Sequence, residues 1–454
     1  MTVDRRLVLG AGLTFSAAAT AAHAAEKASK ALPEAGARNP TFRLAPNSTA
    51  DQTLFLQAAI DAAAKEDMPV ILPPGTFLVA GLQLRTGTRL IGNARTSILA
   101  FSGGETFVTA SDAHGLVLEG IVFDCAYKPF DQTRADGALA ISRSNDIRLL
   151  DLDIRNSAGN GLSLFSCSGR VSGVTITGAL DAGLKSLDAS GMDIKGNTIS
   201  DCGNNGILVW RSTPGEDGSV VSGNRIFNIR NASGGTGEYG NGINVFRAGS
   251  VLVTGNRIAD CAYTAIRGNA ASNIQIIANS CERLGEVGLY SEFGFDGAVI
   301  ANNIVDTAAT GISVTNFNEG GRLAVIQGNL IRNLFRREQE PDDKRGEGIG
   351  VEADAVVSGN TIENAPTVGI QIGWGTFMRD VAATGNVIRH ARVGISVTGA
   401  PDAGKCLIAN NLISNAKDGA IREMDFGKMT GPDLIESQGT SASSRVQLAG
   451  NIAV

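Results

Sequence analysis

The phrase Gly196-Asn197-Thr198-Ile199 returns along the chain as a repeating Gly-Asn-x-Ile. Further full copies stand at Gly223-Asn224-Arg225-Ile226, Gly255-Asn256-Arg257-Ile258, Gly328-Asn329-Leu330-Ile331, Gly359-Asn360-Thr361-Ile362 and Gly385-Asn386-Val387-Ile388. Looser copies occur at Asn279, Asn302 and Asn410. Successive asparagines are 23 to 32 residues apart, so a unit near 23 residues is repeated and lengthened by insertion. A period of this length predicts a solenoid.

Two short apolar runs accompany each asparagine. A Gly-apolar-x-apolar phrase such as Gly206-Ile207-Leu208-Val209 follows several of them by nine residues, and another run, such as Val251-Leu252-Val253-Thr254, leads into the next Gly-Asn. These runs have the two-residue alternation of strands with one face inward. Together with the Gly-Asn-x-Ile phrase, these runs make three short strands per repeat, with nothing helical between them. Such strands can pair only with their copies in neighbouring repeats. The repeat therefore predicts an all-β fold, a parallel β-helix.

The repeated asparagines have a structural role in such a fold. Asn tolerates the left-handed backbone of a tight corner, and its amide both donates and accepts, so identical side chains stacked about 4.8 Å apart can bond along a column. A second column, four residues further on, is mostly Asx and contains Asp201, Asn228, Asp260, Arg283, Asp306, Asn333, Asn364 and His390. We therefore interpret His390 as a corner residue.

The composition suits one long solenoid rather than several globular domains. Of 454 residues 57 are Gly, whereas only 5% are aromatic and 19% charged, and the period runs unbroken through the centre of the chain. The formal net charge of −6 and the pI near 5.3 argue against binding to nucleic acid or anionic membranes. We expect no membrane span in the mature chain.

Residues 1–24 are predicted to be an export signal. Arg5-Arg6 precede a mildly apolar Gly/Ala-rich stretch, and Ala22-His23-Ala24 fits an A-x-A cleavage site. Twin arginines indicate the twin-arginine pathway and its export machinery as a partner, although Asp4 stands where Ser or Thr is usual. The predicted location is periplasmic or secreted.

The six cysteines are predicted to be buried free thiols. Cys125, Cys167, Cys202, Cys261, Cys281 and Cys406 have no C-x-x-C spacing, and a protein that folds in the cytoplasm before export does not need disulfides. Cys202 and Cys261 share a place in the repeat but lie two coils, ~9.6 Å, apart, which is too far to bond without distortion.

The ends of the chain depart from the repeat. Residues 25–48 are interpreted as a linker, and 49–65 as a helix with Leu54, Ala58, Ala59, Ala62 and Ala63 along one side. A strand, the turn Pro73-Pro74-Gly75 and a second strand follow. We expect the helix to cap the open end of a β-helix over 49–424, with coils to about Asn415 and a C-terminal cap over 425–454.

This N-terminal stretch resembles the opening of the pectate-lyase-like β-helix superfamily, in which a small helix precedes a Pro-Pro-Gly-Thr-Tyr-like turn. Phe77 stands here where Tyr is common. With the twin-arginine signal and the Gly-Asn-x-Ile ladder, nearly the whole chain is similar to a family of twin-arginine-translocated β-helix repeat proteins. The resemblance implies export and a right-handed parallel β-helix of about a dozen coils. The resemblance to this family implies no particular activity.

The superfamily binds polysaccharide along the outer face of one stacked sheet, and the resemblance implies that the Gly-Ile-x-Val strands form that sheet. Insertions at 228–241 and 334–347 enlarge the corner before these strands in coils four steps, ~19 Å, apart. We expect them to form two walls around an open floor. Its outward positions, with Glu352 at one margin and Trp210 and Lys185 beyond the other, are Asn244, Phe246, Arg267, Asn269, Tyr290, Glu292, Ser313 and Thr315.

The floor has the residue types that β-elimination needs. The reaction requires a base, an acid for the leaving oxygen, and positive charge beside the uronic carboxylate. The catalytic candidates are Arg267 for charge, Tyr290 or Lys185 as base or acid, and Glu292 to orient its neighbours. The candidates for substrate binding are Trp210, Asn244, Phe246, Arg247 and Glu352. The alternative interpretation is that all of these are ordinary solvated side chains.

Other chemistries are less well supported by the sequence. Glu292 and Glu352 lie ~9.6 Å apart along the axis, at the outer limit for an inverting pair of carboxylates. After signal removal only His114 and His390 remain, which disfavours His-ligated zinc. No cofactor is indicated, and Asp342-Asp343, in a mixed-charge loop, fits solvated carboxylates better than a calcium site.

Two classes of function remain open. One is an exported carbohydrate-active protein, a lyase on an acidic polysaccharide. The other is a non-catalytic envelope scaffold or glycan-binding protein. The partner in both is a polysaccharide or cell-envelope glycan. Convergence of Arg267, Tyr290 and Glu292 in a deep groove would favour the enzyme, and a flat polar sheet the scaffold.

Overall fold

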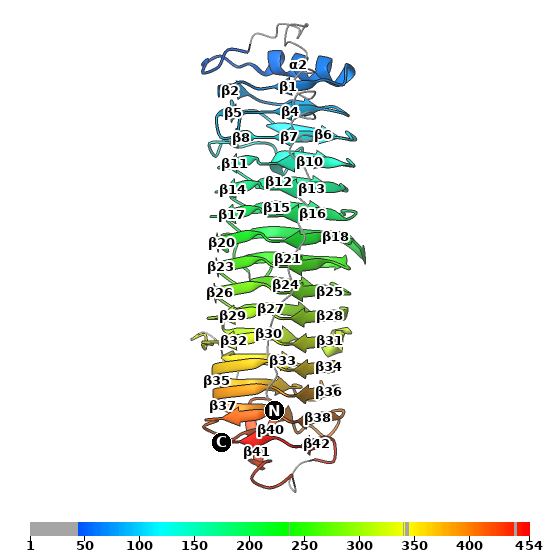
Figure 1. The fold of residues 1–454 in the computed structure, drawn as a ribbon, viewed down its shortest axis with the longest axis vertical. Coiled ribbons are helices and arrows are strands. Elements are labelled where there is room, and N and C mark those ends of the chain that lie inside the picture. Colours follow the sequence, from blue (N-terminus) through cyan, green and yellow to red (C-terminus); the bar gives the residue numbers. More distant parts are fainter. Residues whose placement is uncertain (1–43, 236, 339, 341–344, 440–442) are drawn as a thin grey trace, which may run out of the picture. The chain divides into compact units, whose positions relative to one another are not determined.

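Three stacks of short parallel strands form the body of the protein (Figure 1). The computed structural model describes residues 44–454 except 236, 339, 341–344 and 440–442. The export signal, the linker up to residue 43 and the Asp342-Asp343 pair lie outside the described residues. Within the described part, α2 (Thr53–Lys65) and the single turn η1 (Phe317–Glu319) are the helical elements, so the all-β prediction is confirmed.

Each coil contributes one strand to the first stack, and each strand pairs in parallel with those above and below. The strands of this stack are β1 (Pro69–Ile71), β4 (Arg89–Ile91), β7 (Val117–Glu119), β10 (Ile147–Leu150), β13 (Gly169–Ser172), β16 (Met192–Lys195), β19 (Val220–Ser222), β22 (Leu252–Thr254), β25 (Ile274–Ile277), β28 (Asp296–Ala301), β31 (Arg322–Gln327), β34 (Ala353–Ser358), β36 (Arg379–Thr384), β38 (Cys406–Ala409) and β42 (Val446–Ala449). Fifteen stacked strands are separated by 14 turns, two more than predicted.

The second stack begins at the repeated asparagines. Its strands are β2 (Gly75–Val79), β5 (Ser97–Phe101), β8 (Ile121–Asp124), β11 (Asp153–Arg155), β14 (Thr175–Thr177), β17 (Thr198–Ser200), β20 (Arg225–Ile229), β23 (Arg257–Cys261), β26 (Ser280–Leu284), β29 (Ile304–Asp306), β32 (Leu330–Arg332), β39 (Leu412–Ser414) and β43 (Ile452–Ala453). The first halves of β35 (Thr361–Ile372) and β37 (Val387–Thr398) also belong to it.

The third stack consists of the Gly-apolar-x-apolar strands. They are β3 (Leu82–Leu84), β6 (Val108–Ser111), β9 (Gly137–Ser142), β12 (Asn160–Phe165), β15 (Ala182–Leu187), β18 (Asn205–Glu216), β21 (Asn241–Gly249), β24 (Ile266–Asn269), β27 (Val287–Glu292), β30 (Thr310–Val314), β33 (Glu347–Val351) and β40 (Ile421–Asp425). The second halves of β35 and β37 complete the stack. Both strands run through the corner, so the second and third stacks form one continuous sheet.

The asparagine ladder is confirmed, with a change in its geometry. Asn197 Nδ2 donates to Asn224 Oδ1 at 3.0 Å, and the same bond recurs from coil to coil as far as Asn451. The left-handed residue is the glycine before each asparagine, as at Gly196 with φ 64°. The predicted reason for choosing Asn, tolerance of that conformation, is therefore wrong. The amide bonds, worth about 0.5–1.5 kcal/mol each, are the reason instead.

Two of the looser copies enter the ladder one residue later than predicted. Asn302 and Asn410 have φ 57° and 54° and stand in the place of the missing glycine. The ladder runs through the next residue in each coil, Asn303 and Asn411. Asn can take the left-handed position because its short polar side chain lowers the strain there.

The second column forms the next corner. Left-handed residues stand four places after each ladder asparagine, among them Asp201 with φ 58° and His390 with φ 53°. In the coil of Asn303 this residue is Thr307, φ 66°, rather than the predicted Asp306. His390 is thus a corner residue, as expected.

The core is the interior of the coils, filled by the inward residues of all three stacks. All six cysteines are buried and free, which confirms their prediction. Burial raises the pKa of Cys125, Cys202 and Cys281 to about 12. These thiols are therefore protonated and behave as small apolar residues.

Helix α2 packs against β1 and β3 through Leu56, Ala59 and Ile60. The predicted apolar side of this helix is wrong in part, because Leu54 is 83% exposed. The buried residues have the i, i+3, i+4 spacing of one helical face, and Leu54 falls outside it.

The C-terminal segment contains one more coil than expected. After Asn415, β40 turns back on β41 (Lys428–Asp433) in antiparallel pairing. The chain then returns to the stacks through β42 and β43. The parallel coils therefore extend to the end of the chain.

Candidate functional site

The candidate residues occupy two outward columns of the third stack, because strand pairing keeps one position in register from coil to coil. One column contains Lys185, Leu208, Asn244, Arg267, Tyr290 and Ser313. The other contains Leu187, Trp210, Phe246, Asn269 and Glu292. The repeat had predicted both alignments.

The open floor expected between two walls is not what the structure contains. Asn244 is only 5% exposed, Glu292 2% and Ser313 9%. Of the two loops that enlarge this corner, 230–240 bonds to the floor residue Arg267. The 333–346 loop bonds to Glu286, and Tyr263 contacts both loops. We call Arg267, Asn269, Tyr290 and Glu292 the covered cluster.

Arg267 and Glu292 form the centre of the covered cluster. The Arg267 guanidinium contacts Glu292 Oε1 at 2.5 Å, and their side chains are only 12% and 3% exposed. Asn269 Nδ2 donates to the same oxygen at 3.0 Å. Arg267 also donates through Nη1 to the carbonyl of Gly237 in the 230–240 loop. The positive charge proposed for a substrate carboxylate is thus already bonded to a protein carboxylate.

Burial raises the pKa of the other two candidates. It raises the pKa of Tyr290 to about 12, so at neutral pH the phenol is protonated and can donate but not accept a proton. Burial also raises the pKa of Glu292, against the opposing effect of Arg267. The Arg267 guanidinium lies 5.5 Å from the centre of the Tyr290 ring, at the distance of a cation–π contact.

Tyr263, in the corner between the two loops, links them. Its hydroxyl donates to the carbonyl of Gly235 at 3.0 Å, and Arg337 of the other loop lies over its ring at 5.5 Å. A second contact holds the 333–346 loop, since Arg345 Nη2 donates to Glu286 Oε1 at 2.7 Å. Neither Tyr263 nor Glu286 was among the sequence-predicted residues.

Glu352 has a different role from the one proposed. Its carboxylate accepts from the backbone N–H of Phe317 at 2.7 Å and so orders the turn at η1. Burial raises the pKa of Glu352.

Lys185, Trp210, Phe246 and Arg247 lie towards the N-terminal side of the covered cluster. Trp210 and Phe246 meet edge to face with ring centres 5.9 Å apart, and Arg247 lies 4.6 Å from the Phe246 ring. Lys185 is three coils from Arg267 and pairs with Asp136 at 2.8 Å. It therefore belongs to a second region.

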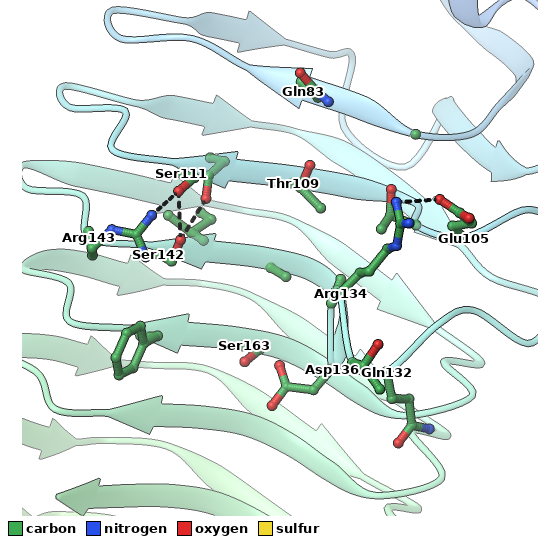
Figure 2. A pocket seen from close by; sticks show the side chains of 18 of the residues that line it. Gln83, Glu105, Thr109, Ser111, Gln132, Arg134, Asp136, Ser142, Arg143 and Ser163 are labelled. Carbon is green, nitrogen blue, oxygen red and sulfur yellow. Dashed lines mark hydrogen bonds and ion pairs between the residues drawn. The ribbon is translucent and has the colours of Figure 1, made fainter. Parts of the chain in front are cut away.

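That second region is an open groove of about 760 Å³ over β3, β6, β9 and β12 of the same stack (Figure 2). Its floor is low because the outward residues in register are Thr109, Ala140 and Ser163, all small. The 125–136 loop, an insertion in the same corner as the other two loops, supplies one side. In Figure 2 Arg134 and Glu105 lie on one side of the groove, and Arg143 with Ser111 and Ser142 on the other.

Sequence reasoning missed the groove because the Gly-Asn-x-Ile phrase starts only at Gly196. Without the register that this phrase supplies, the length of the 125–136 segment could not be compared with that of a regular repeat. A signal was nevertheless present: twelve residues separate Asp124, at the end of one apolar run, from Gly137, at the start of the next.

In the part of the chain that the structure describes, no three His, Cys, Asp or Glu side chains gather in a way that could hold a metal ion. The described residues also include no helix long and apolar enough to cross a membrane.

The model of the right-handed β-helix region matches residues 136–237 and 215–384. Because these matches together span more than half of the chain, the chain belongs to this family, and its parallel β-helix is right-handed. No curated protein matches the chain in sequence.

Several solved structures have a similar fold. The N-terminal fragment of bacteriophage Phi29 gene product 12 matches with a TM-score of 0.55 and 14% identity, over 91% of this chain and 70% of its own. The catalytic unit of a GH87 α-1,3-glucanase from Streptomyces thermodiastaticus matches at 0.47 and 17%, over 92% and 70%. PfbA, a surface adhesin of Streptococcus pneumoniae, matches at 0.45 and 15%, over 85% and 91%. At these identities the likeness concerns the fold alone.

Proposed function

We propose that this member of the right-handed β-helix family binds polysaccharide along the outer face of its third stack. The observation that supports this most directly is the open groove of about 760 Å³, which runs over four strands of the stack and whose lining includes eight hydroxyl or amide side chains. Carbohydrate hydroxyls need such donors and acceptors, and a few precisely placed polar groups give a ligand site its specificity.

Affinity electrophoresis tests this proposal. The full chain without its signal is run through native gels that contain neutral or uronic-acid polysaccharides, and we expect at least one polymer to slow it. The matched control is a gel without polymer, run with a protein of similar charge. Equal mobility in every gel would contradict a glycan-binding function.

A lyase acting on an acidic polysaccharide is the second candidate function. It is favoured by the concentration of shifted pKa values at Tyr290 and Glu292 beside Arg267, since such clusters are common at catalytic sites. In this scheme Arg267 neutralises the uronic carboxylate, and ionised Glu292 accepts the proton beside that carboxylate. Tyr290 donates its proton to the leaving oxygen as the double bond forms and the glycosidic bond breaks. Lys185 is too many coils away to act on the same bond. The 230–240 loop would have to move, because Gly237 holds Arg267.

Unsaturated uronic products, followed by their ultraviolet absorbance, test for the lyase. We expect the Arg267→Ala, Tyr290→Ala double variant to form none. If this variant cleaves a uronic polymer as fast as the unchanged protein, the covered cluster is not the catalytic site. If neither cleaves any polymer, binding without catalysis is the remaining function.

Export through the twin-arginine machinery to the periplasm or the medium is part of the proposal. It is supported by Arg5-Arg6 and the A-x-A site in residues 1–24. Replacing both arginines by lysine should leave the protein in the cytoplasm with its signal uncleaved, as read by fractionation and mass.

We further propose that the two ends of the solenoid are protected. Helix α2 would cover the first coil through Leu56 and Ile60, which are fully buried. The β40–β41 turn within residues 425–454 would shield part of the last coils. Open solenoid ends expose unpaired strand edges, so deletion of residues 49–65 should promote self-association, measured by light scattering.

A further inference from the structure

We propose that the open groove takes an uncharged segment of a glycan, with one sugar ring lying against Phe165. The inference rests on the proposed glycan-binding function and names the ligand class of that site. It separates the groove from the covered cluster, whose candidate chemistry concerns a charged sugar.

The charges at the groove are already balanced within the protein. Four charged side chains line it, and their sum is zero: Glu105, Arg134, Asp136 and Arg143. Each has an ion-pair partner among the described residues. Arg134 bonds Glu105 at 2.6 Å, Arg143 bonds Asp112 at 2.7 Å, and Asp136 bonds Lys185 at 2.8 Å. A polyanion would find no surplus positive charge here, and a polycation no surplus negative charge.

The uncharged lining is suited to sugar hydroxyls. The hydroxyl and amide side chains are Gln83, Thr106, Thr109, Ser111, Gln132, Thr133, Ser142 and Ser163. They lie on four consecutive strands of the third stack, β3, β6, β9 and β12, and on the loops beside them, so they follow the direction of the stack. A chain of sugars laid along the stack would meet a new polar group roughly every 4.8 Å, the spacing of neighbouring strands.

Phe165 supplies an apolar surface in this polar lining. It stands at the outward end of β12, in register with Ser142 of β9, and is 38% exposed. The C–H face of a pyranose is apolar, and a large aromatic ring buries such a surface efficiently. Its neighbours in register are Ser142 on the groove side and Leu187 on the other, and its exposed ring lies outside the core.

The side wall is formed in advance of binding. The backbone N–H of Asp131 donates to the Glu105 carbonyl at 2.8 Å, and Lys128 Nζ donates to the Phe101 carbonyl at 2.8 Å. Within the loop, the Asp131 carboxylate accepts from Thr133 Oγ1 at 2.6 Å. Because these bonds already order the 125–136 loop, a ligand would lose little affinity in arranging it.

Two variants test the groove with the full chain. Ala140→Phe fills the floor from an outward position, and we expect it to abolish binding of neutral hexose oligosaccharides measured by calorimetry. Phe165→Ala should weaken binding by about threefold to tenfold. The matched control is Ala382→Phe, which places the same bulk at an outward, half-buried alanine of the first stack and should change nothing.

Salt and charge distinguish the ligand classes. We expect neutral oligosaccharides to bind with an affinity that is unchanged between low and high salt, and oligouronates not to compete with them. Groove-dependent binding of oligouronates instead, weakened by salt, would overturn the inference and leave the glycan-binding function intact. Binding of neutral oligosaccharides that survives Ala140→Phe would place the site elsewhere. This result would also overturn the inference and leave the glycan-binding function intact. Absence of binding to any glycan would contradict the proposed function itself.

Discussion

The open groove and the covered cluster lie on the same sheet, a few coils apart, and differ in what their loops do. At the groove the 125–136 loop is bonded down beside the sheet and leaves the small floor residues accessible. At the cluster the 230–240 loop bonds to Arg267 through the Gly237 carbonyl, and Glu292 is 2% exposed. One backbone architecture thus carries both an accessible surface and a closed network of charges, and ion pairs with similar distances have different energies in the two regions.

The largest expected effect comes from breaking one ion pair in each region. Glu292→Gln leaves Arg267 buried without a counter-charge, and we expect it to lower the free energy of unfolding by about 3–5 kcal/mol. Glu105→Gln breaks a pair whose side chains are 61% and 65% exposed, and should cost less than about 1 kcal/mol. Denaturant unfolding of both variants measures the difference.

A double variant sharpens this comparison. In Arg267→Met, Glu292→Leu the buried pair is replaced by apolar side chains of similar size, and most of the lost stability should return. Equal, small effects of Glu292→Gln and Glu105→Gln would mean that water reaches the covered cluster.

The next largest effect concerns the link between the two covering loops. Tyr263→Ala removes a hydrogen bond to Gly235 and the ring beneath Arg337, which together contribute about 1–2 kcal/mol. Amide hydrogen exchange should become faster in residues 230–240 and stay unchanged in 125–136. Unchanged exchange in both loops would show that Tyr263 does not hold the cover in place.

A smaller effect is expected from two serines of the same sheet. Ser291 Oγ is fully buried and has no hydrogen-bond partner among the described residues, so Ser291→Ala should raise the free energy of unfolding by about 1 kcal/mol. Ser163 lines the groove and is 6% exposed, whereas Ser291 is fully buried. Ser163→Ala should therefore stay within about 0.5 kcal/mol of the unchanged protein.

The pH dependence of stability should have opposite signs in the two regions. Burial raises the pKa of Glu352 beside the covered cluster, so its contribution is complete at low pH and is lost as the pH rises through that pKa. Hydrogen bonds from Arg143 and Ser111 lower the pKa of Asp112 at the groove to about 2. Its contribution is present above the unfolded value and is lost as the pH falls.

Melting temperature measured across pH separates these contributions. Glu352→Gln keeps an acceptor oxygen for Phe317 and should flatten the decline towards neutral pH. Asp112→Asn should flatten the decline in acid and leave the neutral range unchanged. The same response from both variants would contradict the assignment of opposite pH dependences to Glu352 and Asp112.

One of two small inward residues of the third stack has a packing explanation. Gly268 and Ser291 stand where neighbouring coils carry Val245 and Val314. A Cβ at Gly268 would lie 3.0 Å from Ile274 Cδ1, so that Ile274 already fills the space. Gly268 can be identified from the sequence as an exception to the apolar pattern. Ile274, which lies six residues further on and accounts for it, cannot.

The candidate site was predictable as a set of columns. A constant repeat places equivalent residues in register, so Lys185, Arg267 and Tyr290 could be assigned to one column from spacing alone. Their surroundings could not, because Glu292 and the Gly237 carbonyl reach Arg267 from another strand and from a loop. The covering residue Glu286 and the groove residue Phe165 follow no spacing rule that distinguishes them from other coils.

By itself the sequence determined the solenoid, the register of the full Gly-Asn-x-Ile copies and the free state of the cysteines. The reason is that backbone hydrogen bonding between identical repeats is local and periodic, so spacing is sufficient. The tertiary structure alone decided which part of the third stack is open. That outcome depends on single contacts between distant residues, such as Arg345 with Glu286 over 59 positions, and such contacts have no period that could be read in advance.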